Sequence, residues 1–87
     1  QNYPNPFNAQ TRISFDLLED AIISLFVTDA TGRVQDIFSD QEFTTAGIYN
    51  YEWSGEGRST GIYFFTIQAQ IENFQPVTLS RKMVYLK

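Results

Sequence analysis

The apolar residues of this chain recur at every second position in short runs, and this two-residue period decides the type of fold. The clearest run is residues 61–69, where aromatic and β-branched side chains, the types enriched in strands, follow a Gly- and Ser-rich segment. One parity, which begins at Tyr63, is apolar throughout, whereas the other is apolar only in its first half. No segment keeps the 3.6-residue period of an amphipathic helix over an ordinary helix length. We therefore expect a central strand here, covered on one face and partly on the other.

Further strands are indicated by the same alternation. Residues 12–17 place Ile13, Phe15 and Leu17 on one face, and residues 22–28 do the same with Ile23, Leu25 and Val27. Asp29 and Gly32 then suit a tight turn, because Asp29 can accept a backbone hydrogen bond two residues on and Gly32 can take φ > 0. The remaining predicted strands are residues 33–38, 48–53 and 77–87, with a connection at 39–47 that holds a short edge strand near Phe43.

About six to seven short strands separated by turns predict an all-β, immunoglobulin-like antiparallel β-sandwich. We expect one domain over residues 1–87, with 1–11 as an ordered lead-in anchored by Tyr3 and Phe7 and 12–87 as the sandwich. In the last strand the alternation loses phase, so either a bulge or coverage of both faces is expected there. We expect Gly61 to permit the turn into the central strand.

Composition excludes several classes of protein. The 87 residues include no Cys and no His, so the usual nucleophile–base pairs, disulfides and structural zinc sites cannot form. The formal charge of −4 does not suit a nucleic-acid binder, and no apolar run approaches the length of a membrane span. We expect a protein that is not an enzyme, binds no cofactor or metal and does not span a membrane. The scattered carboxylates suit a solvated surface better than a glycosidase pair or a calcium site.

Aromatic side chains must supply much of the core, because they make up 16% of the chain and no disulfide supports the fold. Trp53 shares a strand face with Tyr49 and Tyr51. Aromatic residues at strand spacing usually pack inward, so a buried Trp53 is favoured. The alternative is an exposed glycan-binding platform formed by the same three rings.

Four short motifs stand in order along nearly the whole chain. Their residues are Asn2, Tyr3, Pro4, Asn5, Pro6, Phe7 and Asn8; Asp29, Gly32 and Arg33; Gly61 and Tyr63; and Lys82, Met83, Val84, Tyr85, Leu86 and Lys87. Together these motifs resemble one protein family, the type A C-terminal sorting domain of the type IX secretion system (Por secretion system sorting domain). The sequence departs from the family pattern at Ala9 and Gln10 and in the long connection 71–77, outside the motifs.

The resemblance implies a folded, non-catalytic module at the C-terminus of a larger secreted protein of a Bacteroidetes-type bacterium. It implies recognition by the type IX translocon in the periplasm, followed by export of the upstream cargo domain across the outer membrane to the cell surface or the medium. In many members a sortase-like surface peptidase removes the domain, often with attachment of the cargo to an anionic lipopolysaccharide. Because the chain begins with Gln1, we expect it to be part of a longer polypeptide.

The residues themselves suggest how such a domain is recognised. The segment Arg81, Lys82, Met83, Val84, Tyr85, Leu86 and Lys87 is basic at both ends and apolar between them, so it can pair edge-on with a strand of the translocon. Lysines on a last strand also protect an edge from aggregation, and each motif taken singly suits such a structural role equally well. Two other functions stay open: an immunoglobulin-like spacer, similar to the β-domain of the flagellar hook-capping protein, and a carbohydrate-binding module that uses Trp53.

Overall fold

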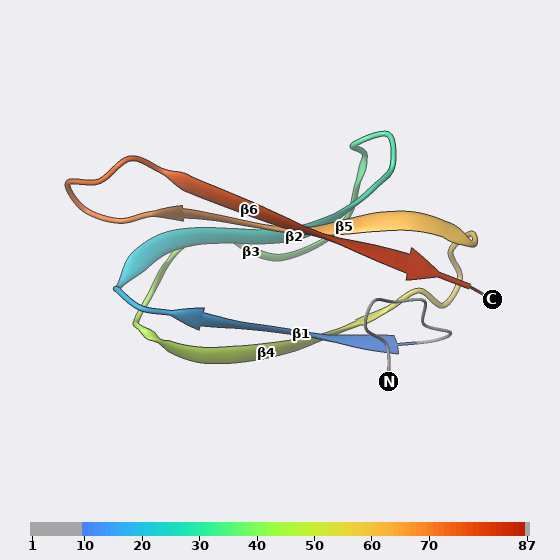
Figure 1. The fold of residues 1–87 in the computed structure, drawn as a ribbon, viewed down its shortest axis with the longest axis horizontal. Helices are drawn as coiled ribbons and strands as arrows, with labels where there is room; N and C mark the ends of the chain where they lie inside the picture. Colours follow the sequence, from blue (N-terminus) through green and yellow to red (C-terminus); the bar gives the residue numbers. More distant parts are fainter. Residues whose placement is uncertain (1–9, 87) are drawn as a thin grey trace.

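The computed structural model describes residues 10–86, and this range consists of strands and turns without a helix. The strands form two antiparallel sheets, of order β1-β4 and β3-β2-β5-β6, which Figure 1 shows as separate layers. The prediction of an all-β, immunoglobulin-like antiparallel sandwich is confirmed. Within the described range no helix has the length and apolar character to cross a membrane. The strands are β1 (Gln10–Leu17), β2 (Ala21–Asp29), β3 (Val34–Thr44), β4 (Gly47–Ser54), β5 (Gly61–Gln70) and β6 (Val77–Tyr85).

The core lies between the two sheets and follows the predicted two-residue period. On β2 the inward side chains of Leu25 and Val27 are fully buried, and on β5 Tyr63 and Phe65 are each 5% exposed. Each such side chain contributes roughly 1.5–3 kcal/mol when it leaves water. The central strand is β5, which pairs with β2 on one side and β6 on the other. The buried apolar residues are Ile13, Leu17, Ala21, Ile23, Leu25, Val27, Trp53, Tyr63, Phe65, Met83 and Tyr85.

The third strand is longer than the sequence predicts. The expected separate edge strand near Phe43 is wrong, because β3 continues to Thr44 and Phe43 pairs with Ile22 of β2. β3 continues past an irregularity at Gln41, where φ is 52°. The backbone N–H of Gln41 donates a hydrogen bond to Ser24 Oγ at 3.0 Å. A bulge of this kind lets the chain resume its pairing in a new register.

The last strand is regular. Its register with β5 runs without a shift from the pair Gly61 and Tyr85 to the pair Ala69 and Val77, so no bulge interrupts it. Val84, on the outward parity, is half-buried, and Leu86 lies beyond the strand end and is 43% exposed. The apparent loss of phase therefore comes from apolar residues on the outer face near the end of an undistorted strand.

Two sequence expectations about the chain's turns and ends have different outcomes. In the β4–β5 connection the residue with a positive φ is Gly57, at 84°, and not Gly61. The expectation that Gly61 permits this turn is therefore wrong. Residues 1–9 of the expected lead-in, with Tyr3 and Phe7, and the final Lys87 lie outside the described residues. The first strand already begins at Gln10, two positions before the predicted start.

Candidate recognition strand

The two edges of the four-stranded sheet differ in regularity. The β3 edge carries register shifts at three places against β2, whereas β6 is a continuous nine-residue strand. Bulged edges do not easily accept another strand, while a long regular edge presents a row of free backbone donors and acceptors. In the described part of the chain β6 pairs only with β5. The geometry of β6 therefore suits pairing with a strand of another molecule.

The strand is exposed along its first part and anchored at its end. Residues 77–82 are all exposed, whereas Met83 is 2% and Tyr85 4% exposed. The Tyr85 ring packs edge-on against Tyr63, with centroids 6.5 Å apart, and Tyr63 packs against Trp53 at 5.0 Å. A Cβ atom built on Gly55 would lie only 2.7–2.8 Å from ring atoms of Tyr85, so only glycine leaves room for this ring.

The positive charges of β6 are not neutralised within residues 10–86. The ion pairs in this range are Arg33 with Asp29, at 3.9 Å, and Arg58 with Asp36, at 2.8 Å. Arg81 and Lys82 form none. Lys82 lies on the outer face of the sheet, whereas Arg81 shares the inward parity of Met83. Both charges are thus free to meet acidic groups of a partner.

Three of the four sequence motifs meet at one end of the four-stranded sheet. Asp29 at the end of β2 pairs with Tyr63 of β5, and Tyr63 pairs with Met83 of β6. Gly61 pairs with Tyr85 in the same way. Residues far apart in the sequence therefore form one continuous band across β2, β5 and β6. The first motif, residues 2–8, lies outside the described residues.

The turn that joins β2 to β3 is held by the Asp29 carboxylate. Asp29 Oδ1 accepts hydrogen bonds from the hydroxyl of Thr31 at 2.6 Å, from its backbone N–H at 2.9 Å and from the backbone N–H of Arg33 at 3.0 Å. The Thr31 hydroxyl, the two N–H donors and the charge of Arg33 together lower the pKa of Asp29, against a smaller opposing effect of desolvation. Gly32 takes φ 92°, so both predictions for this turn are confirmed.

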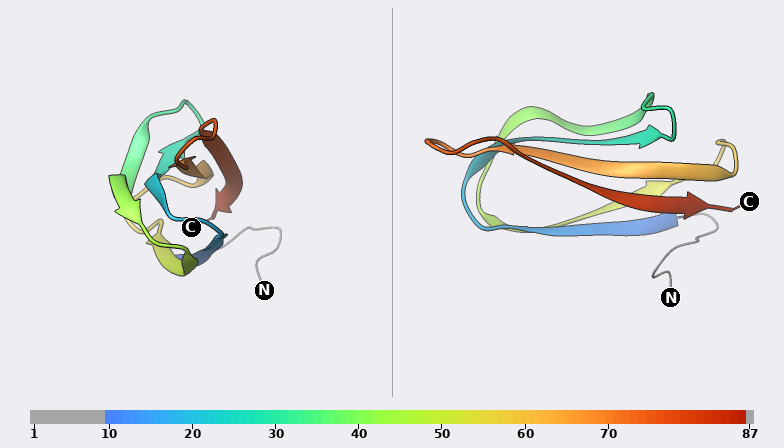
Figure 2. Two further views of the ribbon diagram at one scale, coloured as in Figure 1. Left: turned by 90° about the vertical axis from the view of Figure 1, so that its left-hand side faces the viewer. Right: turned by 45° about the horizontal axis from the view of Figure 1, so that its top comes forward.

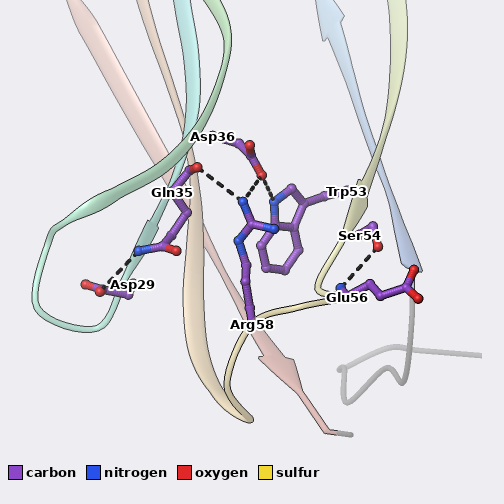
Figure 3. A network of polar contacts seen from close by, with 7 residues as sticks. All are labelled: Asp29, Gln35, Asp36, Trp53, Ser54, Glu56 and Arg58. Carbon is purple, nitrogen blue, oxygen red and sulfur yellow. Dashed lines mark hydrogen bonds and ion pairs between the residues drawn. The ribbon is translucent and has the colours of Figure 1, made fainter.

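Sequence reasoning missed a polar cluster beside the Asp29 turn, which Gln35 joins to that turn through a hydrogen bond from its side-chain amide to Asp29 Oδ2 at 3.3 Å. The Asp36 carboxylate on β3 accepts hydrogen bonds from the Trp53 indole N–H at 2.7 Å and from the Arg58 guanidinium at 2.8 Å (Figure 3). The Arg58 guanidinium also lies 5.4 Å from the Trp53 ring centroid. These contacts join β3, β4 and the connection that follows β4. The partners in these hydrogen bonds are 17 and 22 positions apart in the sequence, so no local sequence pattern predicts the cluster.

The aromatic residues of β4 face the core. Trp53 is 2% exposed and Tyr49 and Tyr51 are half-buried. Phe15 of β1 stacks on Tyr49 and Tyr51, with centroids 5.5 and 6.1 Å apart. The Trp53 indole face is therefore covered by protein and belongs to the core. Within residues 10–86 no three Asp or Glu side chains are grouped closely enough to hold a metal ion.

The structure defines an all-β, immunoglobulin-like sandwich that ends in a regular edge strand. Residues 1–81 match the family described as the secretion system C-terminal sorting domain. The chain belongs to this family, whose members carry the C-terminal signal for type IX secretion. Residues 82–87 follow the matched range. Searches of curated proteins and of solved structures gave no match.

Proposed function

We propose that this domain is the C-terminal secretion signal of a larger cargo protein, and that β6 is the strand by which the type IX translocon recognises it. Family membership supports the export role. The observation that carries the recognition role is the form of β6, a regular nine-residue edge strand whose residues 77–82 are exposed. The burial of Met83 and Tyr85 fixes the position of this edge on the domain.

Recognition by β6 uses two kinds of interaction. A partner strand added to the edge satisfies the free backbone N–H and C=O groups, which gives affinity. Lys82 on the outer face provides an unpaired positive charge for an acidic residue of the partner, which gives orientation and a faster encounter. Arg81 provides a second charge on the inner face. The described remainder of the sandwich positions this strand.

The path of the cargo follows from the same proposal. The domain passes through the periplasm with its cargo, which then crosses the outer membrane and is displayed at the cell surface or released. There a sortase-like peptidase removes the domain and joins the cargo to an anionic lipopolysaccharide. Family membership supports the export step of this path.

Export of a reporter tests the proposal. A periplasmic reporter protein fused ahead of residues 1–87 should reach the medium or the surface of a bacterium that has the type IX system, and the reporter alone should stay in the periplasm. Lys82→Glu should lower export, whereas Arg12→Glu should not, because Arg12 is an exposed residue of β1 on the other sheet. The two variants change the net charge equally. A spacer domain would show no export of the reporter at all.

A reporter that is exported equally well with Lys82→Glu and with the unchanged sequence would refute the role of β6. In that case the positive charges would serve only to protect the edge from aggregation. The mass of the exported cargo tests the cleavage step separately, because removal of the domain shortens the fusion by the mass of the whole sandwich.

A further inference from the structure

Within residues 10–86 the sandwich is unequal, with four strands in one sheet and two in the other, so no described strand covers part of the larger sheet. β4 lies over β3, where the Phe38 and Tyr51 rings pack with centroids 5.3 Å apart. On the opposite side β6 projects past β1, as the end-on view of Figure 2 shows. Val77 and Leu79 share the inward parity of Met83 and Tyr85, yet they are 44% and 64% exposed. Their exposure marks the place where a further strand of the smaller sheet would lie.

A groove runs along this uncovered strip between β1 and β6. It comprises two hollows of about 210 and 220 Å³, which share the side chains of Phe15, Ile67 and Leu79. Figure 1 shows β1 and β6 running in opposite directions in the two layers, and the end-on view in Figure 2 places them along the same side of the sandwich. The floor and walls are mostly apolar, as in sites that receive the side chains of an added strand.

One wall of the groove is the free edge of β1. Among the described residues β1 pairs only with β4, so the backbone groups along its other edge have no strand partner. An extended segment laid in the groove can therefore pair with β1 and place alternate side chains on Leu79 and Ile67. We expect the segment to run antiparallel to β1, because antiparallel strand pairs are commoner than parallel ones.

The charges at the two ends of the groove are opposite. Asp16 and Glu19 line one end, and Arg81 lines the other. Arg81 forms no ion pair within residues 10–86. An occupant with a carboxylate beside Arg81 and a basic residue beside Asp16 and Glu19 would be complementary to both ends.

The space does not suit a second copy of the domain that docks through its own β1. A copy that paired its own β1 with this β1 would be related by a two-fold axis between the two strands. Because β6 projects past β1, the β6 strands of the two copies would then enter the same space. A single extended segment meets no such obstacle.

We infer that the groove between β1 and β6 binds one extended segment of a partner protein, with apolar side chains at alternate positions and a carboxylate that reaches Arg81. This segment completes the smaller sheet at the edge of β1. The site differs from the outer edge of β6 and from Lys82 on its outer face, shares only Arg81 with the proposed function, and does not rest on the export route.

A synthetic peptide tests the inference with the whole 87-residue chain. The probe is an amidated peptide of the same length as β1, with valines at alternate positions and one glutamate near the carboxyl end; its twin has lysine in place of the glutamate. In fluorescence anisotropy titrations the glutamate peptide should bind more tightly, by up to about fivefold, which is the range for an exposed ion pair. Arg81→Glu should reverse this preference. Leu79→Ser should weaken both peptides.

Lys82→Glu distinguishes the groove from the outer face, because it makes the same change in net charge on the opposite side of β6. Reversal of the peptide preference by Lys82→Glu instead of Arg81→Glu would overturn the inference. The inference would also be overturned if neither peptide bound, or if the bound peptide did not increase the hydrogen-exchange protection of the β1 amides. A dimer that light scattering detects and that forms through β1 would assign the groove to a second copy and overturn the inference. Protection of the β1 amides that needs residues 1–9 and no peptide would assign the groove to this segment and would also overturn the inference.

Discussion

Gly55→Ala should destabilise the domain by forcing the Tyr85 ring out of its position. An added Cβ would lie 2.7–2.8 Å from three ring atoms of Tyr85, whereas ordinary contacts begin near 3.4 Å. The ring must retreat by several tenths of an ångström. It cannot do so freely, because Tyr85 is 4% exposed and packs on Tyr63.

The expected cost is that of overpacking a dense core, about 1–3 kcal/mol. For a domain of this size each kcal/mol lowers Tm by roughly 4–8 °C, so thermal unfolding followed by circular dichroism should show a drop of roughly 4–24 °C. Gly61→Ala is the matched control. Nothing lies within 4 Å of a Cβ at Gly61, and its φ is not positive, so this variant should be neutral or more stable by up to about 1 kcal/mol.

A double-mutant cycle identifies the ring as the cause. In a Tyr85→Leu background the smaller side chain leaves room for the new methyl group, so Gly55→Ala should cost less there than in the unchanged protein. Equal costs in the two backgrounds, or equal melting temperatures for Gly55→Ala and Gly61→Ala, would refute the proposed fit between Gly55 and Tyr85.

Further predictions concern the polar contacts and the groove. Asp36→Ala should cost about 1–3 kcal/mol in urea unfolding, because it removes the acceptor shared by Trp53 and Arg58, whereas Asp40→Ala, at an exposed position, should change stability by less than about 0.5 kcal/mol. An NMR titration should find the pKa of Asp29 below the ordinary value. Because the folded-state pKa is the lower one, the stabilising effect is present above the unfolded-state pKa, roughly 3.9, and is lost as pH falls through the folded-state pKa. Leu79→Ser should leave Tm almost unchanged, because the side chain is 64% exposed.

The strands and their inward faces were predictable because they depend on local alternation. Ile13, Ile23 and Tyr63 all lie on the faces that their parity predicts. The Asp29 turn was predictable for the same reason, since its acceptor and donors lie within four residues of one another. The resemblance to the family rested on four motifs, of which three lie wholly inside the matched range and the fourth, residues 82–87, lies beyond it.

Features that depend on distant residues were not predictable. The length of β3 depends on Ser24 of β2, which accepts the Gln41 N–H. The packing of Gly55 depends on Tyr85, thirty positions on, and the exposure of Leu79 depends on how many strands the opposite sheet has. No single-segment pattern contains this information. Gly57 and Gly61 are both glycines near the same turn, and only the backbone shows which one takes a positive φ.

The structure also decides how the role of the last strand should be tested. Deletion of residues 82–87 would remove Met83 and Tyr85 from the core, so loss of export could then come from unfolding alone. Single substitutions of exposed residues avoid this ambiguity. Lys82 is exposed and forms no ion pair within residues 10–86, so its replacement leaves the core intact.

The most direct measurement records export and Tm together for Lys82→Glu and Tyr63→Ala in the same reporter fusion. Tyr63→Ala removes a buried ring, and truncations of large buried aromatic side chains lower the free energy of unfolding by about 3–5 kcal/mol. This variant should therefore lower both Tm and export. Lys82→Glu should lower export while Tm stays within a few degrees of the unchanged domain. Normal export of Lys82→Glu, or a loss of export that occurs only with a matching loss of Tm, would contradict the assignment of the signal to β6.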